Sequence, residues 1–134
     1  MTVRIVRLGT PRAPHEGLRI GTVRRPPRGV RKERFAQDDW YDVWLPALSP
    51  SAELVKRALE AQKDDSPAAE REWTSFVRKF RAEMARSEPA QTIALLAALS
   101  RDADFSVGCY CEDEARCHRS VLRALLEEAG AKVA

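Results

Sequence analysis

A short apolar strand followed by a loop and a helix, near the end of the chain, constrains the fold most. In the segment "FSVGCYCEDEARCHRSVLRALLEEAG", residues 105–130, Phe105, Val107 and Cys109 alternate with small residues, which predicts a buried strand. A helix is expected to begin at about Ser120 and to end at Gly130. A strand that continues into a helix is the building unit of folds in which helices cover a sheet.

The preceding elements extend this pattern to the whole chain. Strands are expected at "VRIVRLG" and "LRIGTVRR", with a shorter one within "YDVWL". Three helices are expected next, from about Ala52, from Ser66-Pro67 to the "EP" at 88–89, and over "AQTIALLAALSRD", whose apolar faces predict burial. The order predicts one α/β domain over residues 1–134, a layered domain with a small, mostly parallel sheet flanked by helices.

Composition limits the cellular setting. The chain has 134 residues, 44% of them hydrophobic and 32% charged, as expected of one globular domain. No apolar run approaches the length of a membrane span, and the first residues are too charged for a signal peptide. We therefore expect a cytoplasmic protein with no membrane partner, in which the three cysteines are reduced.

Positive charge is concentrated in one part of the chain. The net charge is only +3, but eight basic residues lie between positions 12 and 34: Arg12, Arg19, Arg24, Arg25, Arg28, Arg31, Lys32 and Arg34. Such a patch attracts phosphate or carboxylate groups. A solvated loop without a ligand is the alternative interpretation.

The cysteine segment allows several interpretations. A zinc site of Cys109, Cys111, Cys117 and His118 departs from the usual C-x2-C pairs, and the adjacent Cys117 and His118 are expected to reach one ion with difficulty. We therefore predict no metal in the main interpretation. Cys109 is equally well explained as a buried thiol of the strand.

Reactivity is a further interpretation of this segment. Cys117 lies near a helix start beside His118 and Arg119, where positive charge favours a thiolate. Cys111 begins a C-x4-R frame like that of rhodanese-type enzymes, but the acids at positions 112–114 argue against an anion cradle. His118 is expected to carry a proton or donate a hydrogen bond, and Arg119 to pair with a phosphate or carboxylate.

Several segments together resemble the YeaO-like members of domain of unknown function 488. They are the strand "GLRIGTVRR", the turn "RPPRGVRKE", the helix start "LSPSAEL", the helix "REWTSFVRKFRAEM" and the segment "FSVGCYCEDEARCHRSVL". The resemblance places the family's recurrent polar residues at Arg25, Arg28, Gly29, Lys32, Cys117, His118 and Arg119. It implies that the basic turn and the Cys-His-Arg step meet in one cationic pocket. Pro26 stands where the family usually has a tryptophan.

The main hypothesis is a pocket for a phosphate-bearing small molecule or nucleotide. Its ligand-binding residues are Arg25, Arg28, Lys32 and Arg119, and its catalytic residues, where a reaction occurs, are Cys117 and His118. The sequence identifies no cofactor and no oligomeric state. The alternatives are a nucleic-acid-binding module, a metal or redox-thiol site, and an interaction protein with an aromatic patch of Trp40, Tyr41 and Trp44.

Overall fold

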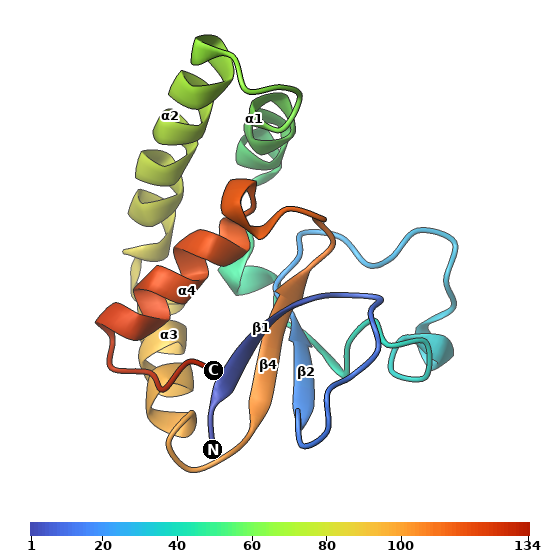
Figure 1. Ribbon diagram of the computed structural model, residues 1–134. Helices are drawn as coiled ribbons and strands as arrows, with labels where there is room; N and C mark the ends of the chain where they lie inside the picture. The colour runs from blue at the N-terminus through green and yellow to red at the C-terminus, as the bar shows by residue number, and fades with distance from the viewer.

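A four-stranded parallel sheet organises the computed structural model, which describes all residues 1–134 (Figure 1). Its strands are β1 (Val3–Arg7), β2 (Leu18–Gly21), β3 (Val43–Trp44) and β4 (Phe105–Cys109), in the order β1-β4-β2-β3. Phe105 pairs with Val3 on one side and with Leu18 on the other, and every strand pair is parallel. Because β4 lies between two strands, all five of its residues are buried. The predicted α/β class is confirmed, and the sheet is entirely parallel.

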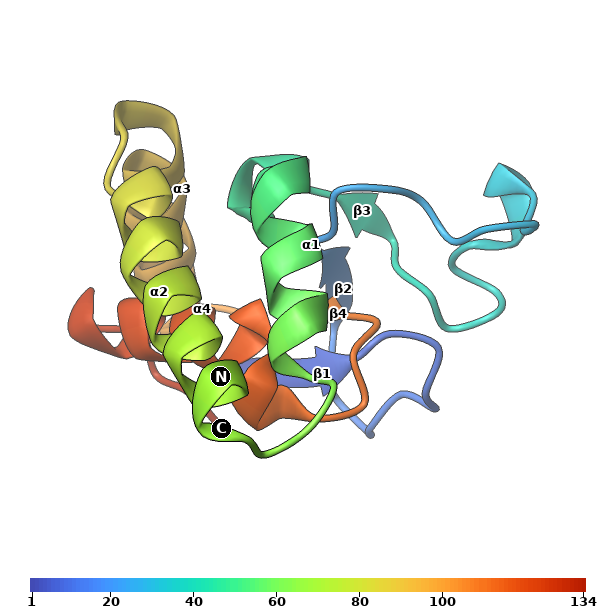
Figure 2. The same cartoon turned by 90° about the horizontal axis from the view of Figure 1, so that it is seen from above.

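Four helices cover one face of the sheet: α1 (Ala52–Ala61), α2 (Pro67–Met84), α3 (Ser87–Leu99) and α4 (His118–Glu128). Figures 1 and 2 show them on one side of the strands, with the loops that follow β1 and β2 on the other. The side chains of Ser51 and Ser66 cap α1 and α2 by accepting hydrogen bonds from the backbone N–H groups of Leu54 and Ala69. None of the four helices has the length and apolar character that a membrane span requires.

The third helix differs from the prediction. It begins at Ser87, so Glu88 and Pro89 lie in its first turn, whereas the sequence predicted that they end the previous helix. Proline is tolerated there because first-turn N–H groups have no partner within the helix. The helix is also less buried than predicted, since Leu95 is 65% exposed and Leu99 41% exposed.

The main core lies between the helices and the sheet. It contains 15 buried residues, including Phe76 and Phe80 of α2, which stack with ring centroids 5.6 Å apart and are fully buried. A side chain of this size contributes about 2–3 kcal/mol when it is buried. Trp44 is 43% exposed, whereas Tyr41 is buried, so the predicted aromatic patch is divided between surface and core.

A second, smaller cluster lies at the carboxyl ends of the strands. It consists of Leu8, Val23, Tyr41, Cys109 and Cys117. Cys109, the last residue of β4, is 3% exposed, as expected of a strand thiol. The chain therefore brings the end of β4 and the start of α4 together at the edge where parallel sheets present polar groups.

Candidate functional site

Two adjoining cavities open at the carboxyl edge of the sheet. We call the first, of about 870 Å³, the arginine cavity, because Arg7, Arg25 and Arg28 line it together with Trp40 and Tyr110. We call the second, of about 380 Å³, the thiol cavity, because it is lined by Cys109, Cys111, Cys117 and His118. Arg25 and Tyr110 line both, and the Tyr110 hydroxyl donates a 2.8 Å hydrogen bond to the Arg25 carbonyl. The two cavities are therefore neighbours with a common wall.

The arginine cavity combines free cations with aromatic rings. Arg25 and Arg28 are exposed, and no side-chain hydrogen bond or ion pair engages their guanidinium groups. Arg7 donates to the Tyr110 carbonyl at 3.3 Å and lies 4.0 Å from a Glu112 oxygen. Trp40 meets Tyr110 edge to face, with ring centroids 5.9 Å apart. Pro26 also lines this cavity, so aromatic contact there comes from Trp40 and Tyr110 rather than from the turn.

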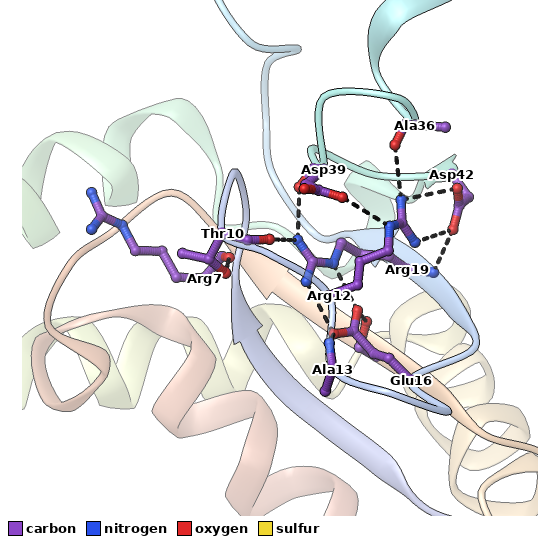
Figure 3. Close-up of polar contacts among 10 residues, drawn as sticks. Arg7, Thr10, Arg12, Ala13, Glu16, Arg19, Ala36, Asp39 and Asp42 are labelled. Atoms are coloured by element: carbon purple, nitrogen blue, oxygen red, sulfur yellow. Dashed lines mark hydrogen bonds and ion pairs between the residues drawn. The ribbon is translucent and has the colours of Figure 1, made fainter.

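A buried arginine fixes the loops around this cavity (Figure 3). Arg19 of β2 is fully buried and holds the Glu16 carboxylate through its Nε at 2.7 Å and its Nη2 at 3.0 Å. Its Nη1 donates to the carbonyls of Thr10 at 2.8 Å and Asp39 at 2.7 Å. Because Thr10 follows β1 and Asp39 precedes Trp40, one side chain sets the spacing of two cavity walls. Arg7 extends away from this cluster in Figure 3.

Four of the eight basic side chains between positions 12 and 34 are already paired within the protein. Arg12 pairs with Asp39 and Asp42, Arg19 with Glu16, and Arg34 with Asp38, while Arg24 donates to the carbonyls of Ser49 and Pro50. The remaining four are Arg25, Arg28, Arg31 and Lys32, which are exposed and carry no side-chain partner. The free positive patch is thus narrower than the sequence indicated.

The thiol cavity has a buried cluster at its floor. Cys117 is fully buried, His118 is 8% exposed, and the Sγ atoms of Cys109 and Cys117 are 2.8 Å apart. The His118 Nδ1 lies 3.8 Å from the Cys117 Sγ, and the three candidate ligand atoms all lie within 4.8 Å of one another. The expectation that the adjacent Cys117 and His118 reach one ion only with difficulty is therefore wrong, because their candidate ligand atoms lie close together. Cys117 is still extended, at φ −121° and ψ 150°, and the helix begins at His118, so the two side chains converge.

The tautomer of His118 follows from its surroundings. Its Nε2 lies 2.6 Å from the Thr22 carbonyl oxygen, which only accepts hydrogen bonds, so the proton is on Nε2. The Nδ1 lone pair then faces Cys117. Burial lowers the pKa of His118 to about 4, so the ring is neutral at pH 7.

Cys111 is the thiol on which negative charge is most favourable. Hydrogen bonds from the thiols of Cys109 and Cys117 lower its pKa, whereas the pKa of Cys109 is raised by its hydrogen bonds with the other two. For Cys117 the bond with Cys109 lowers the pKa, but the bond with Cys111 and burial raise it to about 11. The Gln62 Nε2 lies 3.4 Å from the Cys111 Sγ. From the sequence, Cys111 appeared only in the alternative metal site and in the C-x4-R frame, through its spacing from Cys109 and Arg116. Gln62 carried no sequence signal.

Arg116 and Arg119 make contacts within the protein that hold the loop between β4 and α4 in place. Arg116 pairs with Glu70 and donates to the Ala61 carbonyl at 3.2 Å, so the C-x4-R frame makes no anion cradle. Arg119 is 4% exposed and donates to the Cys111 carbonyl at 2.6 Å, while its Nε is buried without a partner.

The structure distributes the six residues of the main hypothesis over different places. Arg25 and Arg28 line the arginine cavity, and Cys117 and His118, with Arg25, line the thiol cavity. Lys32 begins the short 3-10 helix Lys32–Arg34 and lines neither cavity, and neither does Arg119. The basic turn and the Cys-His step are thus adjacent through Arg25 rather than united in one pocket.

These features define an α/β protein whose free cations and thiols gather at the carboxyl edge of a parallel sheet, where such folds bind ligands. The family model described as the active DUF488-N3 subclade, DUF488-N3a, matches residues 3–130, and the chain therefore belongs to the DUF488 family. The resemblance inferred from the sequence is confirmed. No curated protein and no solved structure matches the chain.

Proposed function

We propose that this protein binds a small phosphate-bearing molecule, such as a nucleotide, in the arginine cavity. The observation that carries the proposal is the pair Arg25 and Arg28, two cations at one cavity with no carboxylate partner. Guanidinium groups bind phosphate through paired, charge-assisted hydrogen bonds. Arg7, the last residue of β1, adds a third positive charge, so the cavity suits an anion better than a neutral ligand.

The walls of the cavity support a ligand larger than inorganic phosphate. Trp40 and Tyr110 provide aromatic surface beside the arginines, and the volume of about 870 Å³ lies within the range of small-molecule sites. A planar group such as a nucleobase gains contact area on these rings. The proposed ligand therefore has an anionic end at Arg25 and Arg28 and an unsaturated or aromatic end at Trp40.

The thiol cavity places reactive side chains next to the proposed ligand site. Because Arg25 and Tyr110 line both cavities, a phosphate held by Arg25 places the adjoining part of the ligand at the mouth of the thiol cavity. We propose that Cys117 and His118 face this part of the ligand. The description of the matching subclade as active supports the view that the protein carries out a reaction.

Titration calorimetry with inorganic phosphate, pyrophosphate and adenosine monophosphate tests the proposal. Arg25→Gln and Arg28→Gln are each expected to weaken binding by about 10- to 100-fold, the effect of one hydrogen bond to a charged group. Arg78→Gln is the matched control, because Arg78 is an exposed arginine of α2 without a side-chain partner. Undetectable binding of all three ligands, or equal weakening by the control, contradicts the proposal.

Binding of single-stranded nucleic acid is a second candidate, favoured by Arg31 and Lys32. Both are exposed, have no side-chain partner and follow Arg28 closely in the sequence, but neither lines the arginine cavity. The double variant Arg31→Gln, Lys32→Gln separates the two candidates. If it weakens oligonucleotide binding and leaves nucleotide binding unchanged, the run binds a phosphate backbone, and log affinity falls steeply with log salt. Absence of oligonucleotide binding at low salt removes this candidate.

A further inference from the structure

We propose that Cys109, Cys117 and His118 bind a Zn²⁺ ion at the floor of the thiol cavity, and that Cys111 completes a tetrahedral site. The proposal rests on the convergence of these side chains, on the hydrogen bond behind His118 and on the buried charge of Arg119. It shares Cys117 and His118 with the reactive part of the proposed function, but it does not depend on a ligand binding in the arginine cavity.

The geometry of the cluster is close to that of a zinc site. Zn–S bonds of about 2.3 Å and Zn–N bonds of about 2.0–2.1 Å place neighbouring ligand atoms about 3.6–3.8 Å apart in a tetrahedron. The Cys117 Sγ and His118 Nδ1 are already 3.8 Å apart, and the three ligand atoms lie within 4.8 Å of one another. The Sγ atoms of Cys109 and Cys117, now 2.8 Å apart, need to separate by about 1 Å. Rotation about the side-chain bonds of two cysteines supplies such a shift.

The hydrogen bond of His118 is the one that metal-binding histidines make. A metal-binding imidazole donates its second ring N–H to a carbonyl or carboxylate, which orients the ring and the lone pair. The His118 Nε2 donates to the Thr22 carbonyl at 2.6 Å, so Nδ1 presents its lone pair to the thiols. Thr22 is itself held by two hydrogen bonds to the Gly108 carbonyl. The ligand and its support therefore come from three different segments that the sheet aligns.

Cys111 is placed to close the site. It lines the same cavity, and its backbone N–H donates to the Cys109 Sγ at 3.4 Å, a contact that stabilises a metal-bound thiolate. Cys111 is the least buried of the three cysteines, so it lies on the side from which an ion enters. Three thiolates and one imidazole are a donor set that selects zinc over harder cations.

Arg119 supplies the charge balance. It is 4% exposed, no carboxylate lies within ion-pair distance of it, and its Nε has no hydrogen-bond partner. A buried cation without a counter-charge is costly. Zn²⁺ with three thiolates and a neutral imidazole carries one net negative charge, and Arg119 contacts the Cys111 carbonyl at 2.6 Å. The zinc site supplies a counter-charge for a buried guanidinium that no carboxylate pairs.

Cobalt substitution tests the site without any mutation. The reduced, chelator-treated full chain is titrated with Co²⁺ under anaerobic conditions, and each thiol that binds releases its proton to solvent. We expect thiolate-to-cobalt charge-transfer bands and the intense visible bands of tetrahedral Co²⁺, saturating at one ion per chain and displaced by Zn²⁺. Weak octahedral bands alone, or saturation without a thiolate band, overturn the proposal.

Variants assign the ligands. Cys117→Ser and His118→Gln are each expected to weaken Zn²⁺ binding by more than about 100-fold, beyond the effect of losing a supporting group. Cys111→Ser is expected to keep one weaker ion and to reduce the charge-transfer intensity. His15→Gln is the matched control, since His15 is exposed on a loop and is the other histidine of the chain.

The two proposals fail separately. Unchanged zinc affinity in both Cys117→Ser and His118→Gln, with circular dichroism showing folded protein, places the ion elsewhere and overturns the zinc site. Arg25→Gln and Arg28→Gln are expected to leave zinc stoichiometry at one per chain. Their effect on nucleotide binding therefore reports on the arginine cavity alone.

Discussion

Replacement of Glu16 by glutamine tests the role of the buried ion pair that supports the arginine cavity. Glu16 is 3% exposed, and it accepts hydrogen bonds from Arg19, from the Ser106 hydroxyl at 2.8 Å and from the Ala13 N–H at 3.1 Å. Burial raises its pKa, but these hydrogen bonds outweigh burial and lower the pKa from 4.5 to about 2. The carboxylate is therefore more strongly bound in the folded protein than in the unfolded chain.

The magnitude follows from this difference in pKa. A fall from 4.5 to about 2 corresponds to about 3 kcal/mol of folding free energy. Because the folded pKa is the lower one, the contribution is complete above pH 4.5 and is lost as the pH falls toward 2. By pH 3 the loss is about 2 kcal/mol. Glu16→Gln removes this titration and also leaves Arg19 buried without its counter-charge, so we expect a cost of about 3–5 kcal/mol at pH 7.

Urea unfolding of both proteins at pH 7 and at pH 3 measures these quantities. The free-energy difference between wild type and Glu16→Gln is expected to be about 2 kcal/mol smaller at pH 3 than at pH 7. Glu128→Gln is the matched control, because its ion pair with Arg81 is exposed and its effect is expected to be small. An equal difference at both pH values, or a Glu16→Gln variant as stable as the control, refutes the reasoning.

Substitutions at four further positions test the packing and the capping of α2. Gly9→Ala is expected to destabilise the protein by about 1–3 kcal/mol in urea unfolding and to distort the arginine cavity, because Gly9 has φ +85° and an added Cβ meets the Trp40 ring at 2.8 Å. Phe80→Ala is expected to cost about 3–5 kcal/mol, whereas Leu95→Ala, at a side chain 65% exposed, is expected to stay within about 0.5 kcal/mol of wild type. Ser66→Ala removes the cap of α2 and is expected to cost about 1 kcal/mol, a loss that Ser66→Asp largely restores. A Gly9→Ala variant of unchanged stability, equal costs at the two apolar positions, or a Ser66→Asp variant no better than Ser66→Ala contradicts the respective reasoning.

The sequence predicts the architecture because local signals determine it. Alternating apolar residues indicate strands such as β4, and Ser66 with Pro67 indicates a helix start, without reference to distant residues. The boundary between α2 and α3 was predicted wrongly because Pro89 is compatible with two positions, after one helix or in the first turn of the next. Local propensity does not distinguish these positions.

The site is less predictable because long-range pairs decide which charges remain free. Arg19 and Arg25 are equivalent in a sequence pattern, yet Arg19 is buried against Glu16 and Asp39, and Arg25 stays free at the cavity. The three-dimensional arrangement of the cysteine cluster is likewise not visible in the sequence. In the sequence, the adjacency of Cys117 and His118 argued against their binding one metal ion together. The backbone changes from extended to helical between them, which reverses that conclusion.

The two faces of the sheet explain why a stabilising ion pair lies so close to the candidate site. Helices cover one face and supply the main core, whereas loops cover the other face. There, Ser106 of β4 and Arg19 of β2 are fully buried, and hydrogen bonds through Glu16 join them. A loop-covered face stabilised by directed hydrogen bonds keeps its geometry only while each partner is present. The position of Trp40 at the arginine cavity therefore depends on the same carboxylate that stabilises the fold, so ligand affinity and stability are expected to fall together when Glu16 is lost.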